Sequence, residues 1–199
     1  PSGGCLCLDE HLDLPLDFDS LQRIGAMIGS GGLVVMDEDT CMVEVARFFM
    51  NFTQRESCGK CVPCREGTKR MLETLEKITG GRGEAEDLAV LEDLGDVITA
   101  TSLCGLGQTA ATPVLSTLHY FRGEYEAHVG EKTCPAHACK ALLSYFVTEK
   151  CIGCTRCARG CPASCIAGKP KERHVIDTAR CVKCGACAAA CPVGAIVKR

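Results

Sequence analysis

A repeated cysteine motif near the C-terminal end constrains this chain more than any other feature. Four cysteines recur thirty positions later, and each set ends in a Cys-Pro pair. The first set is Cys151, Cys154, Cys157 and Cys161, and the second is Cys181, Cys184, Cys187 and Cys191. Three thiolates on so short a loop converge on one point. We therefore expect each set to hold one side of a metal centre instead of forming disulfides across the fold.

The spacing within each set indicates which centre to expect. The pattern C-x2-C-x2-C-x3-C-P resembles that of bacterial two-cluster ferredoxins, in which the fourth cysteine of each run ligates the other cluster. The resemblance implies two [4Fe-4S] clusters, one bound by Cys151, Cys154, Cys157 and Cys191, and the other by Cys161, Cys181, Cys184 and Cys187. Structural zinc is the alternative, but zinc bound by two CxxC pairs would use four thiolates and leave the others without a metal.

The amino-acid composition indicates the cellular compartment and limits the classes of binding partner. A chain of 199 residues with 18 cysteines resembles a disulfide-rich secreted domain in composition. The CxxC runs instead favour free thiolates, so we expect the reducing cytoplasm. A net charge of -3, with 22 scattered basic residues, gives no argument for nucleic acid. No apolar run approaches the roughly 20 residues that a membrane-spanning helix requires, so we expect no membrane segment.

Hydrophobic periodicity predicts a helical region between residues 37 and 127. The acidic cluster at Asp37 is a typical helix start, and apolar residues follow it at helical spacing. Further helices are predicted at about residues 65–78 and 84–100, and a fourth opens at Thr112 with proline at its first position. Four helices joined by short loops favour a small four-helix bundle.

A third cluster motif lies inside this helical region. The run ESCGKCVPCREG contains Cys58, Cys61 and Cys64, and the run SLCGLG places Cys104 in the loop before the fourth predicted helix. Three local thiolates and one distant thiolate supply the four ligands of a further [4Fe-4S] cluster.

These two runs, together with GSGGLVVMDEDTCMVEVARFFMNFTQRESCGKC, resemble the helical domain of the flavin-bearing, NADH-oxidising subunit of respiratory complex I. The same family includes diaphorase (beta) subunits of NAD(P)-linked, electron-bifurcating iron-only hydrogenases and of formate dehydrogenases. The resemblance covers residues 1 to about 142, and the ferredoxin-like tail is similar to that of the hydrogenase subunits. It implies an iron–sulfur relay within an NAD(P)H-dependent oxidoreductase. The family's FMN and NADH site lies in an N-terminal domain without a counterpart here, so we expect no catalytic or flavin-binding residue.

The resemblance also implies the partners. They are a hydrogenase or formate dehydrogenase catalytic subunit, a small [2Fe-2S] thioredoxin-like subunit, and ferredoxin. FMN and NAD(P)H would bind only to the full-length subunit. A non-catalytic reading stays open, in which the chain is a ferredoxin-like carrier that uses its helical region to bind a partner.

The predicted fold class is α+β, with four parts. Residues 1–36, which include a predicted strand at 33–36, resemble the C-terminal half of a ubiquitin-like β-grasp (SLBB-like) domain. Residues 37–127 form the iron–sulfur-binding bundle, residues 128–147 a linker, and residues 148–199 the ferredoxin-like domain with two [4Fe-4S] clusters.

Six cysteines remain outside the three predicted clusters. Cys41, Cys134 and Cys139, with His128, have the ligand types of a closed tetrahedral zinc site that joins the bundle to the linker. His119 and His137 are alternative ligands, and buried free thiols are the alternative to a metal. The other cysteines, which we expect to pack as small apolar residues without ligating a cluster, are Cys5, Cys7 and Cys165.

Overall fold

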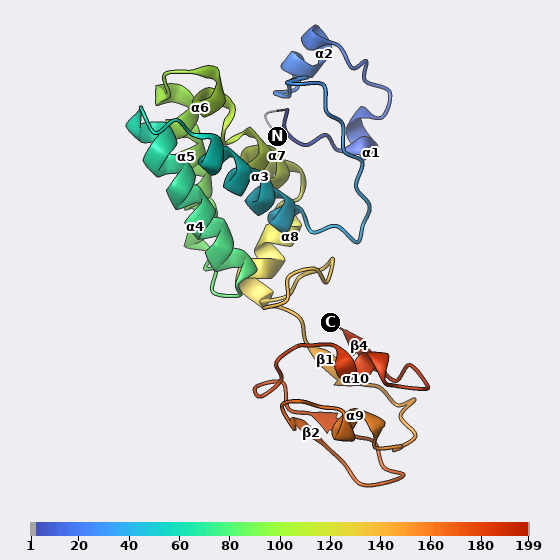
Figure 1. The fold of residues 1–199 in the computed structure, drawn as a ribbon. Coiled ribbons are helices and arrows are strands. Elements are labelled where there is room, and N and C mark those ends of the chain that lie inside the picture. Colours follow the sequence, from blue (N-terminus) through green and yellow to red (C-terminus); the bar gives the residue numbers. More distant parts are fainter. Residues whose placement is uncertain (1–2, 199) are drawn as a thin grey trace.

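The computed structural model describes residues 3–198, so the outermost residues of the predicted first and last domains lie outside the described range. A helical domain occupies the middle of the chain (Figure 1). An N-terminal segment lies along one side of this domain, and a small domain with short strands follows it. The structure is therefore rich in helix, with small sheets confined to the C-terminal domain in the part of the chain that is described.

Four helices form the core of the helical domain. They are α3 (Met42–Glu56), α4 (Thr68–Thr79), α5 (Glu86–Thr101) and α7 (Thr112–Tyr120). Helix α3 packs against α4 and α7, and α5 packs against the same two helices. Met50, Met71, Leu75, Ile98 and Val114 are fully buried where these helices meet. Each helix presents an apolar stripe to the others, as the periodicity predicts.

The first of these helices begins later than predicted. Thr40 donates a side-chain hydrogen bond to Asp37 at 3.0 Å, and its backbone N–H bonds the Asp37 carbonyl at 3.1 Å. This turn uses the acidic cluster that we predicted as the helix start, because aspartate side chains close turns as readily as they cap helices. Cys41 follows at the N-cap position, and α3 starts at Met42.

Several short helices escaped prediction because five residues are too few for a periodic pattern. A π-helix, η1 (Pro63–Gly67), leads directly into α4. The others are α6 (Gly105–Thr109), α8 (Arg122–Glu126) and a second π-helix, η2 (Ala127–Glu131). Gly67 lets η1 approach α5 closely, because a Cβ atom there would lie 2.5 Å from Cγ1 of Ile98.

The N-terminal segment contains two short helices, α1 (Leu8–His11) and α2 (Phe18–Arg23). It contacts α7 through a 2.8 Å hydrogen bond from the Cys5 N–H to Oγ of Ser116 and a 2.9 Å contact between His11 Nε2 and the Tyr120 hydroxyl. The predicted strand at residues 33–36 is wrong: no strand is present among residues 3–36. A strand needs a neighbour to pair its backbone groups, and the apolar side chains at 33–35 are exposed instead.

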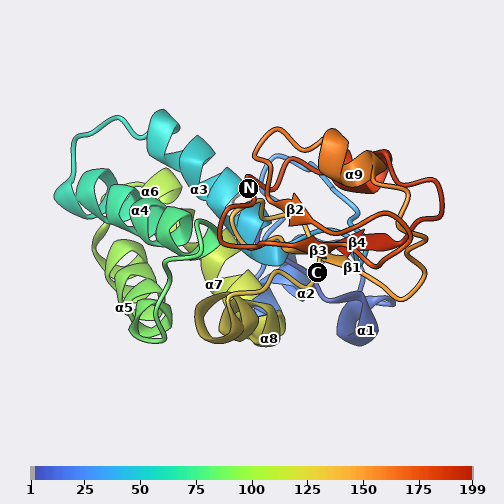
Figure 2. The same ribbon diagram turned by 90° about the horizontal axis from the view of Figure 1, so that it is seen from below.

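The C-terminal domain is built from two similar halves. Strand β1 (Tyr145–Val147) pairs antiparallel with β4 (Ile196–Lys198), with Phe146 opposite Val197. Strand β2 (Ile166–Ala167) pairs antiparallel with β3 (Val175–Ile176). The short helices α9 (Arg156–Arg159) and α10 (Ala186–Ala189) lie at equivalent places in the two cysteine sets. Figure 2 shows these elements as one small unit beside the helical domain.

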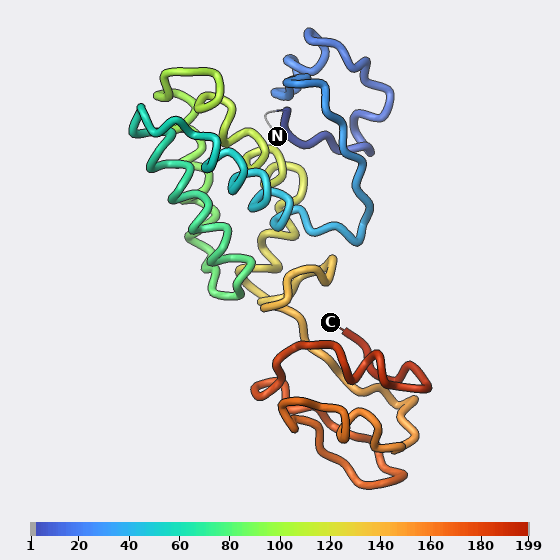
Figure 3. Tube along the Cα trace, viewed as in Figure 1, coloured from blue at the N-terminus to red at the C-terminus, as the bar shows by residue number. Residues whose placement is uncertain are grey.

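The β1–β4 pair closes this domain by joining its two ends. Because β1 precedes the first cysteine set and β4 follows the second, neither half forms this sheet alone. The domain therefore begins with Tyr145, inside the segment that we predicted as a linker. The trace in Figure 3 leaves the helical domain once and does not return to it. Within residues 3–198, none of the helices has the length and apolar character of a membrane span.

Candidate metal centres

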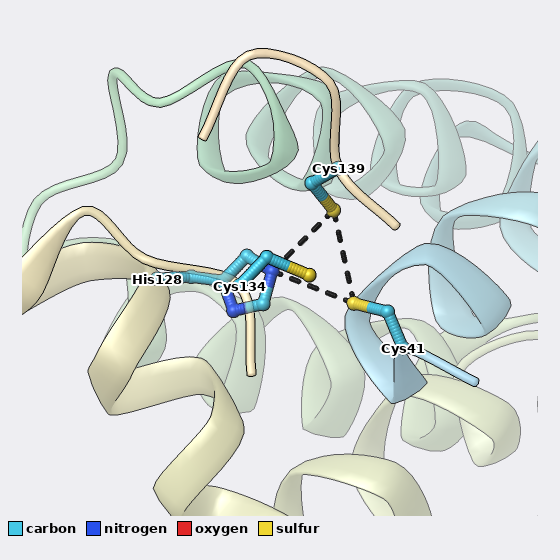
Figure 4. Close-up of side chains that lie close together, drawn as sticks. All are labelled: Cys41, His128, Cys134 and Cys139. Carbon is cyan, nitrogen blue, oxygen red and sulfur yellow. Dashed lines mark hydrogen bonds between the residues drawn. The ribbon is translucent and has the colours of Figure 1, made fainter. Parts of the chain in front are cut away.

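A compact group of three cysteines and one histidine lies where the helical domain ends. Cys41 stands at the N-cap of α3, His128 lies on η2, and Cys134 and Cys139 lie on the loop that follows (Figure 4). The Cys41 sulfur is 3.4 Å from Nε2 of His128 and 3.7 Å from the Cys139 sulfur. Nε2 of His128 is also 3.4 Å from the Cys139 sulfur. All four side chains are buried, and their ligating atoms lie within 4.8 Å of one another.

These distances match the edges of one coordination tetrahedron. With Zn–S and Zn–N bonds of about 2.3 and about 2.0 Å, neighbouring ligand atoms in a zinc site stand about 3.5 to about 3.8 Å apart. A disulfide would instead bring two sulfurs to about 2.05 Å. The three thiols are free. The four residues therefore fit a single tetrahedral metal ion.

The same group shares protons in a way that suits metal binding. Hydrogen bonds from Cys139 and Cys41 lower the pKa of the Cys134 thiol far below its ordinary value. Burial lowers the pKa of His128, but its hydrogen bonds with Cys134 and Cys41 outweigh burial and raise that pKa to about 10. A thiol and an imidazolium must each lose a proton to ligate a metal, so a bound ion would take the place of these protons.

The ring of His128 is oriented by a backbone contact. Its Nδ1 lies 2.7 Å from the carbonyl oxygen of Glu124, which can only accept a hydrogen bond. Donation from Nδ1 leaves Nε2 as the ligating atom, the arrangement usual for histidines that bind metals. His119 and His137, the alternative ligands, do not belong to this group in the described chain.

The cysteines of the helical region lie where η1, α5 and α6 meet. Cys64 is buried on η1, and its sulfur is 3.2 Å from Oγ of Ser57. Hydrogen bonds from the backbone of Leu103 and of Cys64 lower the pKa of Cys61. These contacts bring the residues just before Cys104 beside the cysteine loop.

Helix α6 packs closely on this loop. A Cβ atom at Gly107 would lie 2.6 Å from Cβ of Ser102 and 3.3 Å from Cβ of Cys64. Cys58 and Cys104 are exposed. In a cubane cluster each cysteine binds a different iron. The four cysteine sulfurs therefore stand farther apart than the four ligand atoms around a single zinc ion. The arrangement fits a cluster at the end of the helical domain far from the C-terminal domain (Figure 1).

The C-terminal domain contains two small cavities, and each gathers cysteines from both repeats. One is lined by Cys151, Cys154 and Cys157 of the first set and by Cys191 of the second. The other is lined by Cys181, Cys184 and Cys187 of the second set and by Cys161 of the first. The fold thus carries the fourth cysteine of each set across to the other set's cavity.

Backbone and polar groups around these cavities suit a negatively charged occupant. The N–H of Ala195 donates to the Cys191 sulfur at 3.2 Å, and the N–H of Lys183 donates to the Cys181 sulfur at 3.3 Å. His174 lines the first cavity and is 1% exposed. Its Nε2 is buried without a hydrogen-bond partner among the described residues. An orphaned buried polar atom fits a cavity that holds a polar group.

Cys165 lies in the second cavity, a position that our sequence analysis did not anticipate. Its sulfur is 3.4 Å from that of Cys161, and the residue is 4% exposed. Burial raises the pKa of the Cys165 thiol to about 12. The repeat itself could have drawn attention to this residue, since the equivalent residue in the second half is Ala195. Cys5 and Cys7 are half-buried in the N-terminal segment, away from both cavities.

Comparison with known proteins agrees with this division of the chain. Residues 44–128 match the model of the NADH-ubiquinone oxidoreductase-F iron-sulfur binding region. Residues 44–128 therefore form an iron–sulfur binding region of the kind found in F subunits of NADH-ubiquinone oxidoreductases. Residues 145–198 match the model of the 4Fe-4S dicluster domain.

Two curated relatives illustrate which proteins this chain resembles. NADP-reducing hydrogenase subunit HndC of Solidesulfovibrio fructosivorans is 53% identical over 87% of this chain and 36% of its own length. The F-type NADH-quinone oxidoreductase subunit of Streptomyces coelicolor is 44% identical over 71% of this chain and 31% of its own length. The chain thus spans about a third of these relatives.

A solved structure shows a related fold. The crystal structure of an NAD+-reducing [NiFe]-hydrogenase in the H2-reduced state superposes with a TM-score of 0.58 and 35% identity. The match covers 65% of this chain and 22% of the hydrogenase chain.

Proposed function

We propose that this chain is the electron-relay portion of an NAD(P)H-dependent oxidoreductase, most closely comparable to a hydrogenase diaphorase subunit. The observation that carries the proposal is the pair of cavities that each collect four cysteines from both halves of the repeat. The functions of its relatives, an NADP-reducing hydrogenase and an NADH-quinone oxidoreductase, support the same class of reaction.

Three [4Fe-4S] clusters make up the proposed relay, with the ligand sets that the sequence predicts. When bound, such clusters accept and donate one electron at a time. The chain's own residues would supply thiolate ligands, backbone hydrogen bonds to sulfur, and burial, and none of them acts as an acid, base or nucleophile. We assign FMN and NAD(P)H to another domain of the full-length subunit.

The cluster of the helical region is proposed as the site of exchange with that flavin domain. Cys58 and Cys104 are exposed there, and the apolar side chains of Val62 and Leu103 are 59% and 78% exposed beside them. Exposed apolar residues around a cofactor are typical of a surface that another domain covers.

The two clusters of the C-terminal domain are proposed as a separate port for ferredoxin or a catalytic or [2Fe-2S] thioredoxin-like partner subunit. Cys64 lies on η1 just before α4, where its carbonyl accepts a hydrogen bond from Thr68, whereas Leu142 packs beside Gly81 just beyond the other end of α4. The 12 residues of α4 span about 18 Å at about 1.5 Å per residue. Lys183 of the C-terminal domain bonds the carbonyl of Ala141 next to this far end. Because electron transfer slows steeply with distance, we propose that the two ports exchange electrons through partners.

We further propose that Cys41, His128, Cys134 and Cys139 bind one zinc ion. The support is the tetrahedral spacing of four buried ligand atoms that come from α3, η2 and the following loop. A closed site of this kind contributes to folding and carries no reaction. It would fasten the segment that leads to the C-terminal domain onto the helical domain.

The domain boundaries that we predict from the sequence also remain proposals. Residues 1–36 are assigned to the C-terminal half of a β-grasp domain. The exposed apolar side chains at residues 33–35 support this assignment, since a missing half would cover them. The helical region, the linker and the ferredoxin-like region follow it, with β1 included in the last.

Anaerobic reconstitution tests the number and kind of centres. Quantitation should yield about twelve irons, because each cluster contains four, together with interacting cubane EPR signals after dithionite reduction. One zinc per chain should be found as well. About eight irons would remove the helical cluster from the proposal. A zinc content near zero would mean that the four ligands are buried free groups.

A diaphorase assay tests the assigned reaction class. This chain alone should not oxidise NADH or NADPH. The full-length subunit should reduce an artificial acceptor, and removal of the helical cluster through Cys104→Ala should slow reduction of a large protein acceptor more than reduction of a small dye. A full-length protein that carries clusters but oxidises neither nucleotide would favour the carrier function instead.

A further inference from the structure

The two halves of the cysteine repeat differ in one residue beside their cavities. Cys161 and Cys191 occupy equivalent positions, and each is followed four residues later by a residue that lines the cavity of that cysteine. In the second half this residue is Ala195, and in the first half it is Cys165. One cavity therefore contains four cysteines and the other contains five.

The backbone around the two positions is alike. The N–H of Ala195 donates to the Cys191 sulfur at 3.2 Å, and the backbone N–H of Cys165 donates to the Cys161 sulfur in the same way. Ile166 and Ile196, the next residues, both lie in short strands and are buried. The two halves thus share the same backbone arrangement here, and the first half differs by the additional thiol of Cys165.

The added thiol is close to a proposed cluster ligand. Its sulfur lies 3.4 Å from the Cys161 sulfur, which is hydrogen-bond distance for two sulfur atoms and too long for a disulfide. Cys165 is 4% exposed, so water offers its S–H little alternative. The same cavity is lined by Cys181, Cys184 and Cys187, which complete a set of four ligands with Cys161.

We propose that Cys165 is a positioning and tuning residue, whose S–H donates a hydrogen bond to the Cys161 sulfur and raises the reduction potential of the cluster in this cavity. The inference rests on the proposed function, because it assumes that the cavity binds a [4Fe-4S] cluster. Reduction adds negative charge to a cluster and to its ligand sulfurs, and a donor near a sulfur stabilises that charge. At the equivalent position in the other half, Ala195 offers the Cys191 sulfur only its backbone hydrogen bond.

This hydrogen bond would make two clusters with equivalent ligand sets inequivalent. The donor at Cys165 would favour residence of an electron on the cluster beside it. The direction of transfer through the domain would then depend on a residue that ligates no iron.

Reciprocal substitutions test the proposal. Cys165→Ala should keep the iron content of the reconstituted chain and shift the potential of one cluster downward in an EPR-monitored redox titration. Cys165→Ser, which retains a shorter donor, should restore part of the shift. Ala195→Cys places a thiol at the equivalent position and should shift the potential of the other cluster upward.

Three outcomes would overturn the proposal. Loss of about four irons in Cys165→Ala, with an intact cluster in Cys161→Ala, would identify Cys165 as a ligand. Unchanged potentials in Cys165→Ala and Cys165→Ser would identify it as a small apolar residue. An unchanged potential in Ala195→Cys, with full iron content, would show that a thiol at this position does not tune a cluster. Failure of the proposed function would give a different result from these three outcomes, since the wild-type C-terminal domain would then assemble no [4Fe-4S] cluster.

Discussion

The backbone N–H of Met42 donates a hydrogen bond to the carboxylate of Glu124, with 3.0 Å between the nitrogen and Oε2. The carbonyl oxygen of the same glutamate accepts the hydrogen bond from Nδ1 of His128. Glu124 therefore links the start of α3, where Cys41 lies, to the imidazole of the proposed zinc site. One residue outside the proposed ligand set thus makes hydrogen bonds to two distant parts of the chain.

Replacement of this carboxylate should weaken both the helix and the metal site. Glu124→Ala removes the acceptor at the start of α3, which costs about 1 kcal/mol for a lost helix cap. Misplacement of Cys41 should also lower zinc affinity by about 10-fold or more, as found for groups that orient metal ligands. Chelator competition and thermal unfolding measure the two effects. Glu124→Gln keeps an acceptor and should lose less, and unchanged zinc affinity in Glu124→Ala would contradict an orienting role.

Removal of a proposed zinc ligand should separate zinc from iron. His128→Asn should reduce the zinc content to near zero while the iron content stays at the wild-type level, because the cluster ligands lie elsewhere. The unfolding temperature should fall, since a closed zinc site contributes directly to folding. His119→Asn is the matched control, because His119 lies outside the group and contacts the ring of Tyr120. Equal zinc in both variants would reject this ligand set.

Double variants test the exchange of the fourth cysteine between the two halves. Cys151 and Cys191 line one cavity, so Cys151→Ala with Cys191→Ala should abolish one cluster, the same one that either change abolishes alone. Cys151→Ala with Cys161→Ala should abolish two clusters, since Cys161 lines the other cavity. Mössbauer spectra count the intact [4Fe-4S] clusters. The reverse result, with two clusters lost in the first pair, would mean that each set binds its own cluster.

A single added methyl group should disturb the cluster of the helical region. Gly107→Ala would place Cβ 2.6 Å from Cβ of Ser102, closer than packed atoms can stand, and would make a tight contact of 3.3 Å with Cβ of Cys64. Overpacking of this kind costs about 1 to 3 kcal/mol, and the forced shift of Cys64 should lower occupancy of this cluster. Gly105→Ala is the control on the same helix, because nothing lies within 4 Å of its added Cβ. Iron content and EPR of the two variants give the comparison.

Much of the helical domain was predictable because its pattern is local. The stripes of apolar residues in α4 and α5 placed these helices to within a few residues. The start of α3 was not predictable in this way, because Asp37 and Thr40 form a hydrogen bond with each other and close a turn before the helix. The strand at residues 33–36 was predicted from a short apolar stretch alone, and no strand is present among residues 3–36.

The sequence by itself determined the chemistry of this chain, since cysteine spacing is a local property and three thiolates on a short loop reach one centre wherever that loop lies. Only the tertiary structure decided which distant groups complete each site. Pairing of β1 with β4 carries Cys191 to the first cavity. The packing of α8 against α3, with η2 continuing from α8, brings His128 to Cys41 across 87 positions of sequence. The place of Cys165 beside Cys161 was decided in the same way, because the direction of a side chain depends on the fold that surrounds it.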